Sequence, residues 1–560
     1  MNRPTLAEQA AALAPSGEPL SLSSMDALRT HFRRRVLAAN PEGKVSAVLQ
    51  QELSTFEKTW AGQMTPEVAS RFQSLVAEVG GQLEGRVAVP EFRGTLWTVT
   101  APDPLRGFRS TEALPDSVDV AIIGAGMAGG AQAHALAAAA RAGLRVAVFE
   151  RGGVASATSS ENGGNTETTP EGWLPDPNGT SLQGPYKGYA HVRYLALRAR
   201  FPDAPEITLR AQAYRTTVRL MRAATRSGAR RAQAIVGENI ACHFSPLGST
   251  RVSDHPQEDA ALEKEARHFR RLGIPTEFVD EQTVRALHGL ARARAGRRVL
   301  NDFTLHPRQY VQGLFLQSAL PRGVRLYTET PVLQVISRPD YQTLVTSRGE
   351  VRAGVVVNAL NAYSGALFPE LAFIRPTRSH IAVWAHAPRA LRGSISLQRG
   401  DMYWSQPEIG ASGSTAPLLA GGGPDVPRDH ADDRSIDVDT FEQIVSTVYA
   451  HLPALRGQPP ILFWASAGMG FTADRLPVYG RMEAEDIAAS RRDVFLLSAC
   501  NGNNVHLEEA AANNAELILR NHPLPEFPTE DFALSRFAAW EREPDWPKRQ
   551  KWWETDTARD

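Results

Sequence analysis

The chain has 560 residues, and this length predicts roughly two to four folding units rather than one compact core. Its 61 basic and 61 acidic side chains balance, which argues against nucleic acid or an anionic membrane as a partner and leaves a small neutral or zwitterionic molecule. The two cysteines, Cys242 and Cys500, are too few for a disulfide framework or a cysteine metal cluster, and we expect no metal site.

The N-terminal segment 1–17 lacks a basic region followed by an apolar run, and no stretch reaches the ~18 apolar residues of a membrane span. The longest candidate, 131–143, is interrupted by Gln132, His134 and Arg141. The sequence therefore predicts a cytoplasmic protein.

Residues 1–93 are predicted to form a helical extension. Three segments in it, 31–39, 44–60 and 66–79, place apolar residues every three or four positions with charges between them. Residues 94–117 are rich in turn-forming proline and glycine, and we expect an extended lead-in there.

A strand–helix–strand unit follows. Residues 118–123 and 144–149 are short apolar runs, and 127–142 is an alanine-rich helix pattern between them. The helical part is longer than usual for such a unit, so either the helix bulges or the second strand starts late.

The first turn of this unit carries a glycine motif. Gly124 permits the tight turn, Gly126 lets a pyrophosphate approach the backbone, and Gly129 lets the helix pack closely on the strand. Glu150 ends the second strand 21 residues after Gly129, where a carboxylate accepts hydrogen bonds from the ribose of an adenosine. Glycine-rich helix packing is the alternative reading, and the unit does not by itself separate NAD from FAD.

Further along the chain, 211–225 and 259–272 are amphipathic helices and 507–519 is a second alanine-rich helix. Segments 324–335, 343–347 and 351–360 have the pattern of successive strands, and 375–425 alternates in the manner of strands.

The stretch from Glu150 to Gly164 resembles the segment that follows the ribose acid in the glycine/D-amino-acid oxidase (DAO) family of flavoproteins. Further matches follow in the same order along about residues 95–522: His306-Pro307, Pro331-Val332, 355–363, 418–423, Trp464 with 474–481, and 501–505. Within the family, 95–102 and 474–481 look most like the gamma-glutamylputrescine oxidase branch.

This resemblance implies an α/β chain (α+β overall), with a Rossmann-like FAD-binding domain interleaved with an antiparallel-sheet substrate domain. The predicted boundaries are 1–93 for the helical extension, 94–205, 301–365 and 461–525 for the FAD-binding domain, 206–300 and 366–460 for the substrate domain, and 526–560 for a C-terminal tail.

The resemblance also implies FAD as the cofactor, which we expect to be non-covalent because the cysteine that links flavin in sarcosine oxidases has no clear counterpart. In the family, the last helix points its N-terminus at the pyrimidine edge of the flavin. The positions assigned to FAD are Gly124, Gly126, Met127, Ala128, Gly129, Glu150, Arg151, Ser159, Asn162, Gly163, Gly164, Val332, Asn358, Ala359, Gly502, Asn503, Asn504 and Val505.

Four positions depart from the family pattern. Met469 stands where glycine and D-amino-acid oxidases place the arginine that holds the substrate carboxylate, and Leu419 stands where sarcosine oxidases place an oxygen-activating lysine. Asn504 replaces a usual glycine, and Cys500 replaces a frequent histidine. The resemblance therefore argues against a free amino acid as substrate and against rapid reaction with oxygen.

Two residues are candidates for catalytic roles. His506 aligns with a substrate-binding lysine and could exchange a proton, or it is a buried structural histidine. Tyr403 could form a wall over the flavin ring, or it belongs to the core. Cys500 could be a flavin link or reactive thiol, although buried cysteines are usually small hydrophobes.

We expect oxidation of a C–N bond in a small amine or amino-acid-like substrate, by hydride transfer to flavin N5 followed by hydrolysis of the imine. Oxygen or another acceptor would take the electrons, and association into a homo-oligomer stays open. Two alternatives remain: a flavin oxidase or dehydrogenase that acts on a biosynthetic intermediate, and a flavin-fold binding protein without redox activity.

Overall fold

The computed structural model describes residues 94–168, 201–397 and 402–537, apart from short gaps at 410–412, 428–429, 467, 473, 475 and 503, and the isolated positions 56, 89–90, 194, 197–198 and 542. The three helices predicted within 1–93 lie outside these residues, except that Phe56 is helical and buried. Among the described helices, none combines the length and the apolar character that a bilayer span requires.

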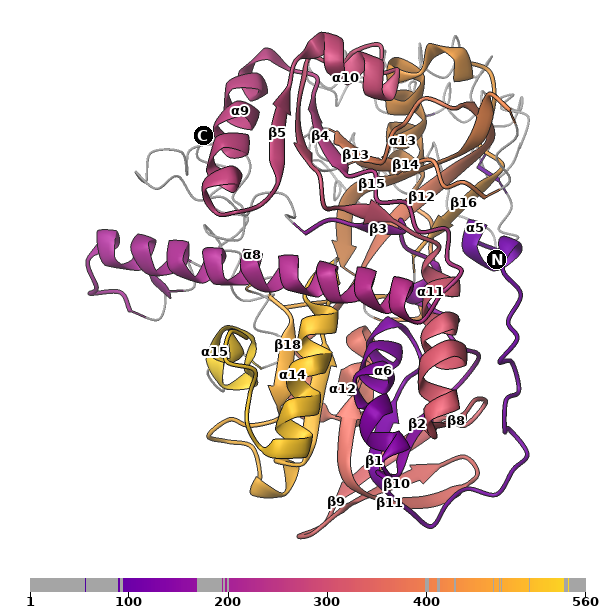
Figure 1. The fold of residues 1–560 in the computed structure, drawn as a ribbon, viewed down its shortest axis with the longest axis vertical. Coiled ribbons are helices and arrows are strands. Elements are labelled where there is room, and N and C mark those ends of the chain that lie inside the picture. Colours follow the sequence, from indigo (N-terminus) through magenta and orange to yellow (C-terminus); the bar gives the residue numbers. More distant parts are fainter. Residues whose placement is uncertain are drawn as a thin grey trace.

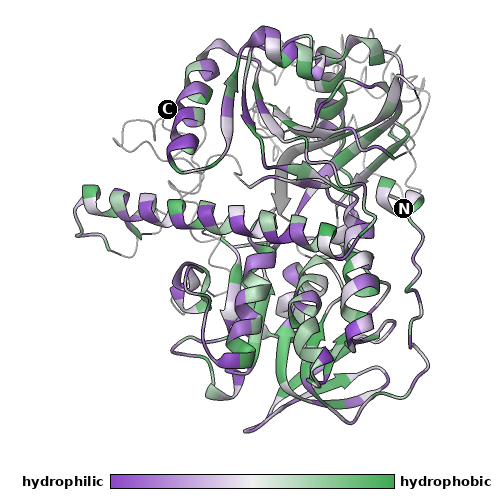
Figure 2. Ribbon diagram, in the orientation of Figure 1, coloured by the Kyte–Doolittle hydropathy of each residue, from purple (hydrophilic) through white to green (hydrophobic). Residues whose placement is uncertain are grey.

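The first of two large sheets has eight strands and a parallel centre. Its parallel strands run in the order β19 (Val494–Ser498), β11 (Gly349–Asn358), β1 (Ser117–Ile123), β2 (Val146–Phe149) and β8 (Arg325–Tyr327). Antiparallel strands at its margins are β18 (Val478–Arg481), β9 (Val332–Ser337) and β10 (Gln342–Thr346). Strand β2 and the second half of β1 are continuous, buried apolar runs, as expected for strands covered on both faces, and Figure 2 shows this hydrophobic centre.

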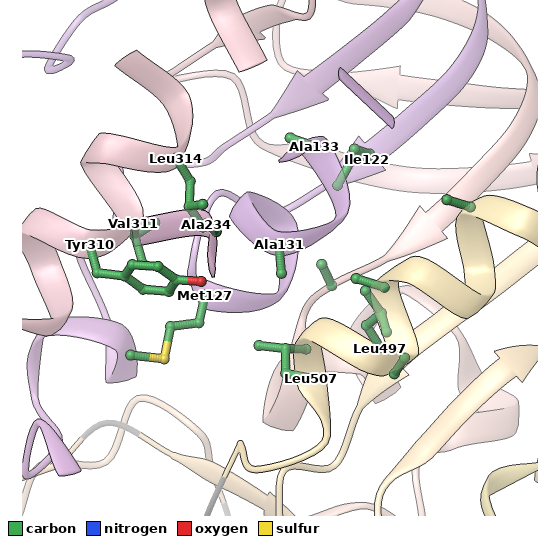
Figure 3. Close-up of a cluster of buried hydrophobic side chains, with 14 of the residues drawn as sticks. Ile122, Met127, Ala131, Ala133, Ala234, Tyr310, Val311, Leu314, Leu497 and Leu507 are labelled. Carbon is green, nitrogen blue, oxygen red and sulfur yellow. The ribbon is translucent and has the colours of Figure 1, made fainter. Parts of the chain in front are cut away.

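Helices α6 (Met127–Arg141) and α14 (Leu507–Arg520) pack against each other and against this sheet. The small alanine and glycine residues of α6 let α11 (Pro307–Gly313) pack closely against it. At Gly130, for example, an added Cβ would lie 3.3 Å from Cγ1 of Val311 in α11. Figure 3 shows Ala131 of α6 and Leu507 of α14 in this cluster, with Val311 on its other side. The helix has no bulge, and the second strand starts late, at Val146, which pairs with Val120.

The second sheet has nine strands and is mostly antiparallel. Its order is β16 (Leu462–Ala465), β12 (Arg375–Pro388), β15 (Thr415–Pro427), β14 (Met402–Ser405), β13 (Ser394–Leu397), β4 (Ser249–Ser253), β6 (Ala295–Val299) and β5 (Thr276–Val279), while β17 (Met469–Phe471) also pairs with β12. Helices α9 (Pro256–Arg271), α10 (Glu281–His288) and α13 (Val438–His451) belong to this half of the molecule (Figure 1).

The 32-residue helix α8 (Glu206–Gly237) lies across the molecule between the two sheets (Figure 1). The chain passes back and forth between the sheets, so the predicted interleaved α/β fold is confirmed.

Two local predictions need correction. The lead-in, predicted to be extended, contains a short helix, α5 (Leu96–Thr100), whose N-terminus is stabilised by a capping box between Thr95 and Thr98. Strands β16 and β17, placed after the predicted boundary at 461, pair with β12 in the antiparallel sheet.

Candidate cofactor and active site

A cleft opens at the carboxyl ends of β1, β2 and β11, where the strand order reverses on either side of β1. In doubly wound sheets this is the place where ligands bind. The described residues that line the cleft come from segments far apart in the sequence: 123–128, 149–162, 331–332, 359–367, 469–479 and 497–507.

Each of the three motif glycines lies in a close contact, with backbone at Gly124 and Gly129 and with a serine side chain at Gly126. Gly124 has a φ of +104°, and a Cβ there would lie 2.9 Å from the carbonyl oxygen of Ala359. A Cβ at Gly129 would lie 1.8 Å from the carbonyl oxygen of Gly124, and one at Gly126 would lie 2.8 Å from Oγ of Ser159. The loop therefore has the close approach between helix and strand that the motif predicts.

The N-terminus of α6 faces the cleft through Gly126, Met127 and Ala128. The N–H groups of a first helical turn have no partners within the helix, and they attract anions. Here the Met127 N–H donates to Oγ of Ser159 over 2.9 Å, so this serine lies beside the surface that a pyrophosphate would approach.

The carboxylate of Glu150 lies at the end of β2. Its Oε2 accepts from the Ala125 N–H over 2.7 Å, and its Oε1 accepts from the Gly152 N–H over 2.8 Å. Burial raises the pKa of Glu150, while these backbone N–H groups and Arg151 act in the opposite direction. Each carboxylate oxygen retains accepting capacity, so the group suits a pair of ribose hydroxyls.

Arg151, Tyr363 and Asp432 form a cluster at the nucleotide end of the cleft. The Arg151 guanidinium stacks on the Tyr363 ring at 4.3 Å and donates to Oδ1 of Asp432 over 3.0 Å. The Tyr363 hydroxyl donates to the same Oδ1 over 2.8 Å. The pKa of Asp432 is lowered: burial by itself would raise it, but the hydrogen bonds from Arg151 and Tyr363 and the nearby arginine charges together have the larger effect. Because Asp432 lies between β15 and α13, the cluster joins the two halves of the molecule.

The loop that follows η2 (Thr158–Ser160) is held through three successive carbonyl oxygens. The Thr95 hydroxyl donates to the Ser160 carbonyl oxygen over 2.6 Å. The indole Nε1 of Trp464 donates to the Glu161 carbonyl oxygen over 3.1 Å, and that of Trp97 donates to the Asn162 carbonyl oxygen over 2.6 Å. Two of these donors lie on or directly before α5, so the short helix supports a wall of the cleft.

Among the described residues of the turn between β19 and α14, three have positive φ: Ala499 at 58°, Asn501 at 50° and Gly502 at 81°. Such conformations cluster at functional sites, where the surrounding structure imposes them. Asn361, itself at 51°, holds this turn, because its Oδ1 accepts from the N–H groups of Cys500 (2.9 Å) and Gly470 (3.2 Å). Asn361 lines the cleft and was not assigned from the sequence, although it lies inside the family-like block 355–363.

The structure brings most of the residues assigned to FAD to this cleft. Those that line it are Gly124, Gly126, Met127, Ala128, Glu150, Arg151, Ser159, Asn162, Val332, Ala359, Gly502 and Asn504. Gly129, Gly163, Gly164, Asn358 and Val505 are not among the lining residues, and Asn503 is outside the described residues. Asn358 acts through its neighbours, since its Oδ1 accepts from the Leu360 N–H over 3.1 Å and from the Ser364 hydroxyl over 3.2 Å.

Neither catalytic candidate is among the residues that line the cleft. Tyr403 packs over two glycines, since a Cβ at Gly163 or Gly421 would lie 2.6 or 2.3 Å from its ring. His506 is buried against α8, where its Nε2 donates to the Leu220 carbonyl over 3.1 Å and its ring meets Phe532 at 5.0 Å. Burial lowers the pKa of His506 to about 3. These positions favour the structural reading of both residues.

Three of the four departures from the family pattern, Met469, Leu419 and Cys500, lie in apolar clusters. Met469 and Cys500 line the cleft and form a small hydrophobic cluster with Phe471. Leu419 is fully buried in another apolar cluster. Burial raises the pKa of Cys500. Within the described part of the chain, no group of three or more histidine, cysteine or acidic side chains has the arrangement of a metal site.

The fold and this cleft define a dinucleotide-binding protein with a separate sheet domain over the far end of the site. The chain belongs to the DAO family of FAD-dependent oxidoreductases, whose sequence pattern matches residues 119–507. It is thus an enzyme that uses FAD, and the glycine loop, the helix N-terminus and Glu150 fit that cofactor.

Solved structures with the same fold include L-proline dehydrogenase from P. horikoshii, with a TM-score of 0.58 and 17% identity over 75% of this chain and 97% of that one. Glycine oxidase from Geobacillus kaustophilus has a TM-score of 0.56 and 18% identity over 76% and 100% of the two chains. L-amino acid deaminase from Proteus vulgaris has a TM-score of 0.55 and 16% identity over 76% of this chain and 98% of that one. A comparison with curated proteins finds no match. At these identities the likeness is one of fold.

Proposed function

We propose that the enzyme oxidises a C–N bond of a small amine or amino-acid-like substrate that enters in its neutral amine form. FAD, when bound, supplies a hydride acceptor at N5, and the imine product hydrolyses in water. The protein's part is to align the carbon that loses the hydride, to exclude water and to hold the cofactor.

The distribution of charge along the cleft is the observation that carries this proposal. Among its described lining residues, both charged side chains, Glu150 and Arg151, stand at the nucleotide end. Met469, Leu497, Cys500 and Leu507 are apolar. Hydride transfer from a neutral amine requires no strong base, and an apolar wall disfavours a charged ammonium group.

Met469 supports an amine in preference to a free amino acid. It is buried, lines the cleft and cannot pair with a carboxylate. A substrate carboxylate at this wall would lose its hydration without gaining a cation. The finer likeness to the gamma-glutamylputrescine oxidase branch stays a prediction of the sequence.

Anaerobic mixing tests the proposal. The purified yellow protein should lose its visible flavin absorption when primary or secondary amines are added under nitrogen, and the rate should rise with pH as more amine is neutral. Zwitterionic amino acids of the same side chain should react more slowly. Bleaching by amino acids but not by amines would contradict the substrate class, and bleaching by neither would contradict C–N oxidation.

We also propose that FAD is held without a covalent bond. Cys242 lies in the main hydrophobic core, and the Cys500 thiol accepts a hydrogen bond from Asn361 Nδ2 over 3.2 Å. A thiol with a raised pKa is a poor nucleophile. Acid precipitation should release the yellow colour into the supernatant, and colour that stays with the pellet would overturn this point.

A further inference from the structure

A buried ion pair joins α8 to the first turn of α14. Arg231 donates through Nε (2.7 Å) and Nη2 (2.9 Å) to the two carboxylate oxygens of Glu508. The side chains are only 5% and 7% exposed. The hydroxyls of Tyr310 and Ser227 donate to the same carboxylate over 3.0 and 3.1 Å, and Arg231 Nη1 donates to Thr166 over 2.9 Å. The Glu508 carboxylate therefore accepts hydrogen bonds from three side chains, those of Arg231, Tyr310 and Ser227.

This pair reaches the cofactor cleft through the turn before α14. Arg231 Nη2 also donates to the carbonyl oxygen of Asn504 over 3.0 Å. Asn504 and Leu507 line the cleft, and Glu508 follows directly after Leu507. Both charges thus lie at the end of α14 that faces the cleft.

The order of groups along the cleft identifies the part of FAD that meets this turn. The Glu150 carboxylate is suited to the ribose, and the N-terminus of α6 to the pyrophosphate. With the ribose and the pyrophosphate held there, the residues that would hold the isoalloxazine ring are those further along the cleft, among them Met469, Cys500 and Asn504.

Charge at this place affects the reduced cofactor more than the oxidised one. Reduction adds negative charge to the flavin, and a buried charge acts on it through a medium of low dielectric constant. A helix N-terminus is electropositive, and Glu508 in its first turn opposes that effect. Arg231 offsets Glu508, and a guanidinium stays protonated when buried.

We propose that Arg231 and Glu508 are positioning residues that hold the 504–507 turn against the flavin and set the charge balance that fixes its reduction potential. This inference rests on FAD binding and does not depend on which substrate is oxidised. The competing reading is a structural tie between α8 and α14 with no effect on the cofactor.

Two variants of the FAD-loaded protein separate these readings. Glu508→Gln keeps the side-chain shape and leaves the Arg231 charge uncompensated, so the midpoint potential should become more positive. Arg231→Met combined with Glu508→Gln removes both charges, and the potential should return towards the wild-type value. Buried pairs are often replaced together at little cost in stability, which favours folding of the double variant.

Glu509→Gln is the matched control. It makes the same change of charge one residue further along α14, at a side chain that pairs with Arg226 and Arg230. Glu509 is itself only 2% exposed, but its two partners are 29% and 43% exposed, so solvent screens the arginine charges left uncompensated and the potential should move less. The potentials would be measured by reductive titration against reference dyes, without substrate.

Opposite outcomes contradict the inference. A wild-type potential in Glu508→Gln would overturn it, as would a double variant whose potential stays as far from wild type as that of the single one. If Glu508→Gln does not retain FAD, Arg231→Met alone replaces it: this variant leaves the Glu508 charge uncompensated, so its potential should become more negative, and a wild-type potential would overturn the inference. Loss of FAD from both variants, with equally lowered melting temperatures, would assign the pair a structural role alone.

Discussion

Gly129 of α6 lies against the backbone of Gly124, such that a Cβ at position 129 would stand 1.8 Å from the Gly124 carbonyl oxygen. Because that neighbour is backbone, the loop must shift to admit any side chain. Gly129→Ala should lower the free energy of unfolding by about 1–3 kcal/mol and reduce the bound FAD. Melting temperature and the ratio of flavin to protein absorbance measure both effects. Gly237→Ala is the control, since a Cβ there meets nothing within 4 Å.

Variants at Gly126 and Ser159 separate two effects of a side chain at position 126: a steric clash with Ser159, and obstruction of the space that the pyrophosphate would occupy. Gly126→Ala should displace the Ser159 hydroxyl, which lies 2.8 Å from the new Cβ. Adding Ser159→Ala opens that space but removes the acceptor of the Met127 N–H, so stability should recover to that of Ser159→Ala alone, which serves as the reference. We expect FAD affinity to stay reduced in the double variant, because the methyl group still occupies the approach to the phosphates. Full recovery of the Kd for FAD would show that the phosphates bind elsewhere.

Removing the Glu150 carboxylate should weaken FAD binding. A charge-assisted hydrogen bond contributes about 1.5–3 kcal/mol, so Glu150→Ala should raise the Kd by about 10- to 150-fold. Glu150→Gln should lie between this variant and wild type. Fluorescence titration of the apoprotein with FAD measures the change, with Glu112→Gln, an exposed pair with Arg109, as the control. An unchanged Kd in Glu150→Ala would rule out the ribose contact.

The Arg151–Tyr363–Asp432 cluster should slow the release of FAD. Its ion pair is 52% and 65% exposed, so its loss is worth at most about 1 kcal/mol. Asp432→Ala should therefore speed cofactor dissociation by about two- to fivefold, measured by the appearance of free flavin fluorescence after dilution. Glu408→Gln removes a similarly exposed pair with Arg389 and should leave the rate unchanged. Equal rates in the two variants would contradict the prediction.

Stability should fall in acid through the buried His506. Its folded pKa is about 3, below the ordinary value of 6.5, so the unfolded chain binds more protons between these values. The contribution of neutral His506 to the free energy of unfolding is therefore complete above pH 6.5. Below pH 6.5 it declines by up to about 1.4 kcal/mol per pH unit. His306 and His288, with pKa values lowered by burial to about 4, add to the same trend.

His506→Gln tests this assignment. Glutamine can still donate to the Leu220 carbonyl but does not titrate, so the melting temperature should drop less between pH 8 and pH 5.5 than in wild type. The exposed His386→Gln is the control. The pH dependence of flavin reduction should not change in His506→Gln, and a changed profile would restore a catalytic role for this residue.

Several parts of the site could be predicted because they are local in sequence. The motif glycines, the helix that follows and Glu150 belong to one strand–helix–strand unit, whose geometry depends on steric limits within about 30 residues. The helices α8, α9 and α14 carry clear periodicity, although α8 is longer at both ends than its predicted core 211–225. Strands β4, β5 and β6 were missed because each is only four or five residues long and lies among helices.

What the sequence alone determined is the identity of the cofactor loop and the order of its elements, since these follow from backbone sterics and hydrophobic patterning. The tertiary structure decided which side chains meet. It turned Tyr403 towards Gly163 and Gly421, and His506 towards α8. It also paired Arg231 with Glu508, 277 residues away. Such pairings depend on strand register and on the packing of distant helices, and a buried charge finds its partner through that packing.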